Sequence, residues 1–189
     1  KVIKAARQFG VTSPLGNNLS LGLGTSGVSP LEMASAYSTI ANLGIYNEPY
    51  FVERIEDFKG NPLYENFYHG VQNYAPKSIY PLLNMMQGVI DGGTGRIVRQ
   101  MGFKHPAGGK TGTTNNFQDS WFDGFTKDFS TSVWVGYDNN EPMIDRHAHG
   151  LTGASAAAPI WTLYMEKALQ GKNQIKFSIP EGIKFEKVD

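Results

Sequence analysis

Residues Gly108–Thr114 read Gly-Gly-Lys-Thr-Gly-Thr-Thr, and Trp121–Phe125 reads Trp-Phe-Asp-Gly-Phe seven residues further on. Threonine favours extended backbone and offers a hydroxyl for hydrogen bonding. Glycine has no Cβ and lets a ligand approach the backbone, while Lys110 places a positive point charge beside it. The segment therefore predicts a strand edge that holds an anion, either a carboxylate or a phosphate.

A phosphate loop of the Walker type is one alternative for this segment. That loop needs a glycine five residues before Gly109, where Lys104 stands, and a helix directly after the Lys-Thr pair. Residues 112–116 read Gly-Thr-Thr-Asn-Asn, which is a poor start for a helix. The sequence therefore disfavours a nucleotide, whereas a plain edge strand with a surface lysine stays open from composition alone.

The composition describes a globular chain without a charge bias. Its 189 residues, 40% of them hydrophobic, suffice for one domain with a core or for part of a larger domain. Lys+Arg and Asp+Glu are equal at 17 each, so no net charge attracts nucleic acid. The chain has no cysteine, which excludes disulfides and thiolate metal sites, and no apolar run approaches the roughly 20 residues of a membrane span.

Several helices are predicted from apolar spacing and end signals. Ser29–Glu32 forms a capping box with proline at the first helical position, which predicts a helix over 30–43. Ser78 is predicted to cap another helix that stops at the glycines of 92–95, and the last helix has Pro159 in its first turn. Two further expectations are the tail of a helix over 1–9 and a buried extended piece over 19–25.

The strands are predicted from alternating apolar residues and turn signals between them. They cover residues 51–57, 63–64, 110–113, 120–127 and 130–137. Helices followed by grouped strands and a final helix predict an α+β fold, with an antiparallel sheet flanked by helices. No linker divides the chain, so we expect residues 1–189 to belong to a single domain.

Other polar and aromatic groups each have a functional and a structural interpretation. His147 and His149 resemble a metal pair that Asp145 could complete, but a solvated loop is the favoured interpretation. Glu32 is expected to cap a helix rather than to act as a general acid. The aromatic residues are expected to pack on the sheet and not to stack on bases; they are Trp121, Phe122, Phe125, Trp134 and Tyr137.

Six stretches of the chain stand in an order typical of one family: Leu23–Ala34, Gly88–Gly95, Gly108–Thr114, Asp119–Phe125, Val133–Tyr137 and Ala156–Trp161. Together they resemble the transpeptidase domain of class A penicillin-binding proteins. The resemblance covers about residues 10–183 and implies a β-lactamase/transpeptidase-like fold, of which the chain would hold only the C-terminal portion. The family implies no cofactor and no metal.

The resemblance also implies a reaction and roles for residues of the opening segment. A serine-type D-Ala-D-Ala transpeptidase cross-links peptidoglycan stem peptides by acyl transfer, and β-lactam antibiotics acylate the same serine. Lys110 would supply positive potential for the terminal carboxylate of the stem peptide, and Thr111 and Thr113 would offer hydroxyls to it. The N–H of Thr113 would be one of two oxyanion donors, Gly112 would keep the strand bare, and Thr114 would border the bound substrate.

One departure from the family limits what this chain can do. The nucleophile of the family lies in a Ser-x-x-Lys motif, and a second motif is Ser-x-Asn; no serine here fits either pattern. In the family, both motifs precede the region that corresponds to the start of this chain at Lys1. We therefore expect residues 1–189 to be inert without the segment that carries the serine.

Two hypotheses follow from a binding strand without a nucleophile. In the first, the chain is the C-terminal segment of a transpeptidase domain at the extracytoplasmic face of a bacterial membrane, and its partner is the N-terminal segment of the same domain as a separate chain. In the second, it is a non-catalytic module that binds a peptide or a β-lactam without acylation. A soluble β-lactamase is a third interpretation, but it too needs the missing serine.

Overall fold

The computed structural model describes residues 1–186 of the chain. Its helices are α1 (Val2–Gln8), the 3-10 helix η1 (Leu19–Leu23), α2 (Pro30–Ala41), α3 (Pro76–Asp91), α4 (Ile97–Gln100), the π-helical turn η2 (Gly153–Ala157) and α5 (Ala158–Ala168). Its strands are β1 (Ile45–Tyr46), β2 (Arg54–Glu56), β3 (Pro62–Glu65), β4 (Val71–Gln72), β5 (Gly108–Thr113), β6 (Asp119–Phe125) and β7 (Ser130–Gly136).

The central sheet consists of three antiparallel strands in the order β5-β6-β7. Lys110 lies opposite Asp123 on β6, and Trp121 lies opposite Trp134 on β7. A tight turn joins β6 to β7, where the N–H of Thr126 donates to the carbonyl of Phe129. The three strands predicted for this region are confirmed, with ends that differ by a few residues.

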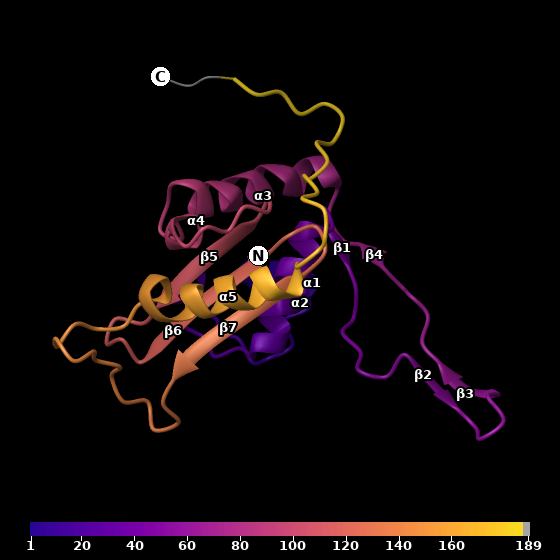
Figure 1. Cartoon of the computed structure of the whole chain (residues 1–189), viewed down its shortest axis with the longest axis horizontal. Helices are drawn as coiled ribbons and strands as arrows, with labels where there is room; N and C mark the ends of the chain where they lie inside the picture. Colours follow the sequence, from indigo (N-terminus) through magenta and orange to yellow (C-terminus); the bar gives the residue numbers. More distant parts are fainter. Residues whose placement is uncertain (187–189) are drawn as a thin grey trace.

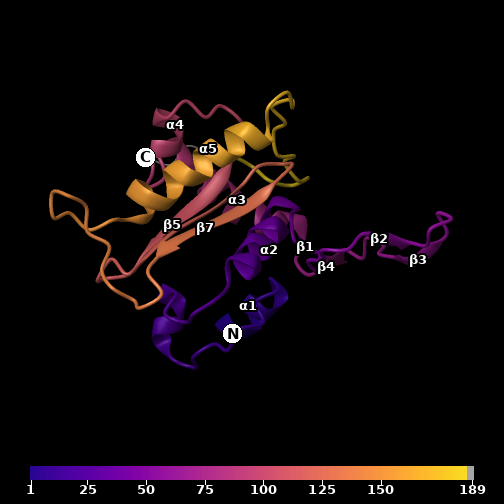
Figure 2. The same cartoon turned by 60° about the horizontal axis from the view of Figure 1, so that its bottom comes forward.

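Helices cover both faces of this sheet (Figure 2). Helix α5 packs on one face together with η2, and α2 packs on the opposite face. Helix α3 packs against β5, the outer strand of the sheet (Figure 1). The α+β class with a helix-flanked antiparallel sheet is therefore confirmed.

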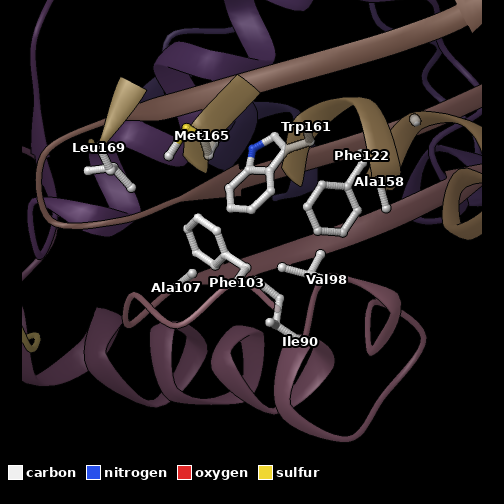
Figure 3. Close-up of a cluster of buried hydrophobic side chains, with 10 residues drawn as sticks. Ile90, Val98, Phe103, Ala107, Phe122, Ala158, Trp161, Met165 and Leu169 are labelled. Atoms are coloured by element: carbon white, nitrogen blue, oxygen red, sulfur yellow. The ribbon is translucent and has the colours of Figure 1, made fainter. Parts of the chain in front are cut away.

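Trp161 on α5 is the centre of the core on its side of the sheet (Figure 3). Its fully buried indole meets Phe103 and Phe122 edge to face, with ring centroids 5.3 and 5.2 Å apart. The indole N–H donates to the carbonyls of Gly124 and Thr131, on two neighbouring strands. The indole therefore connects the helix to both strands, and it packs so closely on Gly124 that a Cβ there would lie 2.8 Å from the ring.

A second apolar cluster lies between the sheet, α2 and the first half of α3. Its buried members are Ala36, Tyr37, Ile40, Ala41, Ile79, Tyr80, Leu83, Phe125 and Phe177. Helix α3 thus contributes to both clusters, because Ile90 near its end belongs to the cluster around Trp161.

The start of α2 confirms the predicted capping box. The Glu32 carboxylate accepts hydrogen bonds from the backbone and hydroxyl of Ser29, and also from Thr12 and Ser13 in the loop after α1. Burial alone would raise the pKa of Glu32, but the hydrogen bonds from Ser13, Ser29 and Thr12 outweigh it and hold this pKa well below its usual range. Glu32 therefore caps α2 and also attaches the preceding loop to it.

Two predictions for helix and strand boundaries were wrong. Within residues 19–25, Leu19–Leu23 form η1 rather than a buried extended piece, because the Asn18 side chain accepts the N–H of Leu21 and stabilises a local turn. Leu19 is fully exposed. Ser78 does not cap α3, which begins at Pro76 with Ala75 at the cap position. Proline suits the first helical turn, and this helix starts three residues earlier than a Ser78 cap would place it.

An arm of the chain extends away from the sheet between α2 and α3 (Figure 1). β1 and β4 pair at its base, and β2 and β3 form the predicted hairpin at its tip. β1, β4 and α4 were not predicted, because they have two to four residues and are too short to show a periodicity. In the part of the chain that the structure describes, no helix has the length and apolar character needed to span a membrane.

Replacement of Trp161 by alanine is expected to lower the free energy of unfolding by about 3–5 kcal/mol, because it leaves a cavity between α5 and two strands. Urea unfolding followed by far-ultraviolet circular dichroism measures this change. Leu163→Ala on the same helix is the control, since Leu163 is 62% exposed and its truncation is expected to cost about 0.5 kcal/mol or less. Equal losses in the two variants would contradict the role given to Trp161.

Candidate active site

The second half of β5 presents a free strand edge. Gly108 and Gly109 are buried, and a Cβ on Gly108 would lie 3.3 Å from Met86 on α3. Lys110 and Thr113, further along the strand, are exposed. Within residues 1–186 only β6 pairs with β5, so the edge from Lys110 to Thr113 is open to a ligand.

The hydrogen-bond alternation of the β5–β6 pair determines which backbone groups face this edge. The N–H of Thr114 donates to the carbonyl of Asp119 at 3.1 Å, just beyond the end of β5. In an antiparallel pair such bonded positions recur at every second residue. Gly112 and Lys110 therefore direct their backbone groups at β6, and Thr111 and Thr113 direct theirs away from it. The N–H of Thr113 is thus a donor at the open edge.

The Lys110 side chain brings its charge to the same edge. Its Nζ donates to the carbonyl oxygen of Thr111 at 2.8 Å. That carbonyl faces outward by the same alternation, so the ammonium lies beside the strand and not beneath it. The edge therefore combines a cation and an outward N–H, a pairing that suits an anion or a developing oxyanion.

The hydroxyls of Thr111 and Thr113 lie on the α5 face of β5, and both contact other segments. The Thr111 hydroxyl oxygen is 2.8 Å from that of Thr94, in the turn between α3 and α4. The Thr113 oxygen accepts the N–H of Gly153, the first residue of η2, at 3.0 Å. Gly153 packs so closely on the sheet that a Cβ would lie 2.3 Å from the carbonyl oxygen of Trp121.

The Thr114 side chain, unlike those of Thr111 and Thr113, closes a turn. Its hydroxyl oxygen accepts the N–H groups of Gln118 and Asp119, at 2.9 and 2.8 Å, and closes the turn between β5 and β6. A contact between Thr114 and substrate stays a prediction. Thr94, Gly153 and Asp123 are site neighbours that the sequence analysis did not identify, since only the fold brings them to β5.

Asp123 is a buried carboxylate directly across the strand pair from Lys110. It is 5% exposed, and the Ser132 hydroxyl on β7 donates to it. Burial raises the pKa of Asp123 to about 6, and the hydrogen bond from Ser132 limits the rise. Burial and this nearby carboxylate also raise the pKa of Tyr37 on α2. A titratable group thus lies on the strand next to Lys110, directly across from it.

The two histidines weighed as metal ligands lie in the loop after β7. Their ring centroids are 6.4 Å apart, and the Asp145 carboxylate accepts the backbone N–H groups of His147 and His149. The bonds from His149 and His147 lower the pKa of Asp145. Among the residues that the structure describes, no three potential ligands gather as a metal site would need.

A family model for the penicillin binding protein transpeptidase domain matches residues 6–162. The chain belongs to this family. It is 36% identical over 190 residues to penicillin-binding protein 2D of Bacillus subtilis, covering 97% of this chain and 26% of that protein. It is 35% identical over 184 residues to penicillin-binding protein 1A of Neisseria gonorrhoeae, covering 94% of this chain and 22% of that protein. The transpeptidase segment thus spans about a quarter of the length of these relatives.

Solved structures of penicillin-binding proteins share its fold. PonA1 of Mycobacterium tuberculosis aligns with a TM-score of 0.85 and 26% identity, over 96% of this chain and 52% of that chain. PonA1 has also been solved in complex with penicillin V. Penicillin-binding protein 1A of Haemophilus influenzae gives a TM-score of 0.82 at 27% identity, over 96% and 34% of the two chains. The predicted family and the transpeptidase-like fold are confirmed.

Replacement of Asp123 by asparagine is expected to stabilise the protein at pH 7.5 by about 3 kcal/mol. The pKa of Asp123 is about 6 in the folded chain, against an ordinary 3.8. The folded state therefore binds this proton more tightly, and the cost of the ionised carboxylate grows as the pH rises from about 4 to about 6 and is complete above that. Near pH 4 most of this cost is absent, so the gain from asparagine should be small there.

Thermal unfolding at pH 7.5 and pH 4 measures the difference between the Asp123→Asn variant and the unmodified protein. Asp138→Asn serves as the control, since Asp138 is exposed just after β7. A stabilisation that is equal at both pH values would contradict the raised pKa of Asp123.

Proposed function

We propose that this chain supplies the carboxylate-binding wall of a peptidoglycan D,D-transpeptidase site. The observation that carries the proposal is the open edge of β5 in a member of the penicillin-binding family. At that edge the Lys110 ammonium lies 2.8 Å from the Thr111 carbonyl, and the Thr113 N–H faces outward. These groups match a substrate that ends in a carboxylate and passes through an oxyanion.

The substrate is proposed to be the D-Ala-D-Ala end of a stem peptide, lying extended along the edge of β5 as an added strand does. Lys110 provides positive potential for its terminal carboxylate, and Thr111 and Thr113 donate hydroxyl hydrogen bonds to it. The N–H of Thr113 stabilises the negative charge that develops on the attacked carbonyl oxygen. Gly112 has no side chain to obstruct the approach, and Thr114 borders the site at the end of the strand.

The nucleophile of this reaction is proposed to lie outside residues 1–189, because no serine of the chain has a lysine three residues later. The serine Oγ would attack the penultimate D-Ala carbonyl and lose its proton to a nearby base, and D-alanine would leave with a proton on its nitrogen. An amine of a second stem peptide would then take the acyl group and regenerate the serine. A β-lactam would acylate the same serine by opening its ring.

The segment with the serine is proposed to be the N-terminal part of the same transpeptidase domain, at the extracytoplasmic face of a bacterial membrane. Residues 1–189 alone would bind a carboxylate but perform no acyl transfer. The complex of PonA1 with penicillin V supports β-lactams as ligands of this site.

Labelling with a fluorescent penicillin followed by intact-mass analysis tests where the nucleophile lies. The chain is isolated together with the polypeptide that carries the Ser-x-x-Lys motif, and the mass of each piece is measured after labelling. We expect the added mass on the segment with the motif and none on residues 1–189. Label on residues 1–189 themselves would overturn the proposal. Reversible binding to a folded, isolated chain, with no acylation in any preparation, would instead support a non-catalytic binding module.

Lys110→Ala is expected to lower the second-order constant for acylation by penicillin about 10- to 100-fold. A hydrogen bond to a charged group contributes about 1.5–3 kcal/mol, and its loss slows acylation accordingly. Lys127→Ala is the matched control, since Lys127 is an exposed lysine at the β6–β7 turn. Stopped-flow acylation of the protein that contains both segments measures the constants. Equal constants for Lys110→Ala and the control would show that Lys110 does not bind the carboxylate.

A further inference from the structure

Thr94 contacts the candidate site through one side-chain oxygen. It lies in the turn between α3 and α4, and its hydroxyl oxygen is 2.8 Å from that of Thr111 on β5. The two residues are 17 positions apart, so the fold alone creates the contact. We propose that Thr94 is a positioning residue that orients the Thr111 hydroxyl toward the substrate carboxylate. This inference rests on the proposed function of the β5 edge.

Each of the two hydroxyls has a single proton, and this determines which of them donates in the hydrogen bond between Thr94 and Thr111. A threonine hydroxyl has one proton to donate and can accept two hydrogen bonds. When a carboxylate occupies the edge, the Thr111 proton goes to the carboxylate, since a charged acceptor makes the stronger bond. The Thr94 hydroxyl must then donate to Thr111. The result is a chain of two hydrogen bonds in one direction, in which each bond polarises the next.

Thr113 shows the same arrangement with a backbone donor in place of a hydroxyl. Its oxygen accepts the N–H of Gly153 at 3.0 Å, which leaves its own proton free to point elsewhere. Both threonine oxygens on this face of β5 therefore have a neighbour from another segment of the chain: Thr94 for Thr111 and Gly153 for Thr113. Of these two neighbours, Thr94 acts through a side chain and can be changed without altering the backbone.

The turn around Thr94 is held firmly enough to position a hydroxyl. The N–H of Gly93 donates to the carbonyl of Gly88, and that of Gly95 donates to Val89, both on the last turn of α3. Gly95 is buried, and a Cβ there would lie 3.2 Å from the Phe122 ring. Phe122 is the cross-strand partner of Thr111, so the turn rests on the strand pair that carries the site.

Selectivity for a carboxylate follows from this geometry. If Thr94 is replaced by valine, the Thr111 hydroxyl loses the neighbour that orients it, and its proton is no longer directed at the carboxylate. Lys110 and the Thr113 N–H are unaffected, so binding of the rest of the ligand should persist. The loss should therefore be confined to ligands that carry the carboxylate.

The test measures second-order acylation constants of the protein that contains residues 1–189 and the serine segment, with benzylpenicillin and with its methyl ester. For Thr94→Val we expect a 3- to 10-fold fall with benzylpenicillin and no change with the ester, so that the ratio of the two constants falls. Thr94→Ser should restore the ratio, because it keeps the hydroxyl. Thr25→Val is the matched control: the Thr25 hydroxyl is also close to another hydroxyl, that of Ser20, in a different part of the chain.

An unchanged ratio in Thr94→Val would overturn the role of Thr94 while leaving the proposed function intact. An equal fall with both compounds would also overturn it, since it would show general damage to the site. Failure of Thr94→Ser to restore the ratio would exclude the hydroxyl as the cause. If the unmodified protein is not acylated by benzylpenicillin at all, the proposed function fails, and the role of Thr94 fails with it.

Discussion

The antiparallel pairing of β5 with β6 is the interaction on which the rest of the structure depends. It sets the bonded positions at Lys110, Gly112 and Thr114 and leaves the backbone groups of Thr111 and Thr113 at the outer edge. A shift of one residue in this register would move every side chain to the other face and turn the Thr113 N–H inward. The register is secured by the partners of β6, because Phe122 packs under Trp161 and Phe125 packs against α2.

Helix α3 divides β5 into a structural half and an exposed half. It packs beside Gly108, where a Cβ would lie 2.7 Å from Phe125 and 3.3 Å from Met86, whereas Lys110 further along the strand is exposed. The turn that follows α3 then places Thr94 beside Thr111. One helix thus protects part of a sheet edge, which would otherwise invite unspecific pairing, and supports the part that stays open for a ligand.

The sequence predicted the local elements well where the signals lie within a few residues. The capping box at Ser29–Glu32, the proline at the start of α5 and the threonine-rich strand are all local features, and each forms the predicted element. β1 and β4 escaped prediction because they owe their shape to each other across the arm, and α4 because its four residues are too few to show a periodicity. The exposed η1 was misread because alternating small and apolar residues do not show whether another segment covers them.

The sequence by itself determined the family and the residue types that can hold a carboxylate, because the order of the motifs and the chemistry of Lys110, Thr111 and Thr113 are local properties. Only the tertiary structure decided which of their groups face outward and which neighbours orient them. Thr94, Gly153 and Asp123 reach β5 from segments far along the chain or from the facing strand. Such contacts depend on packing and strand register, and these arise from the whole fold rather than from any stretch of the sequence.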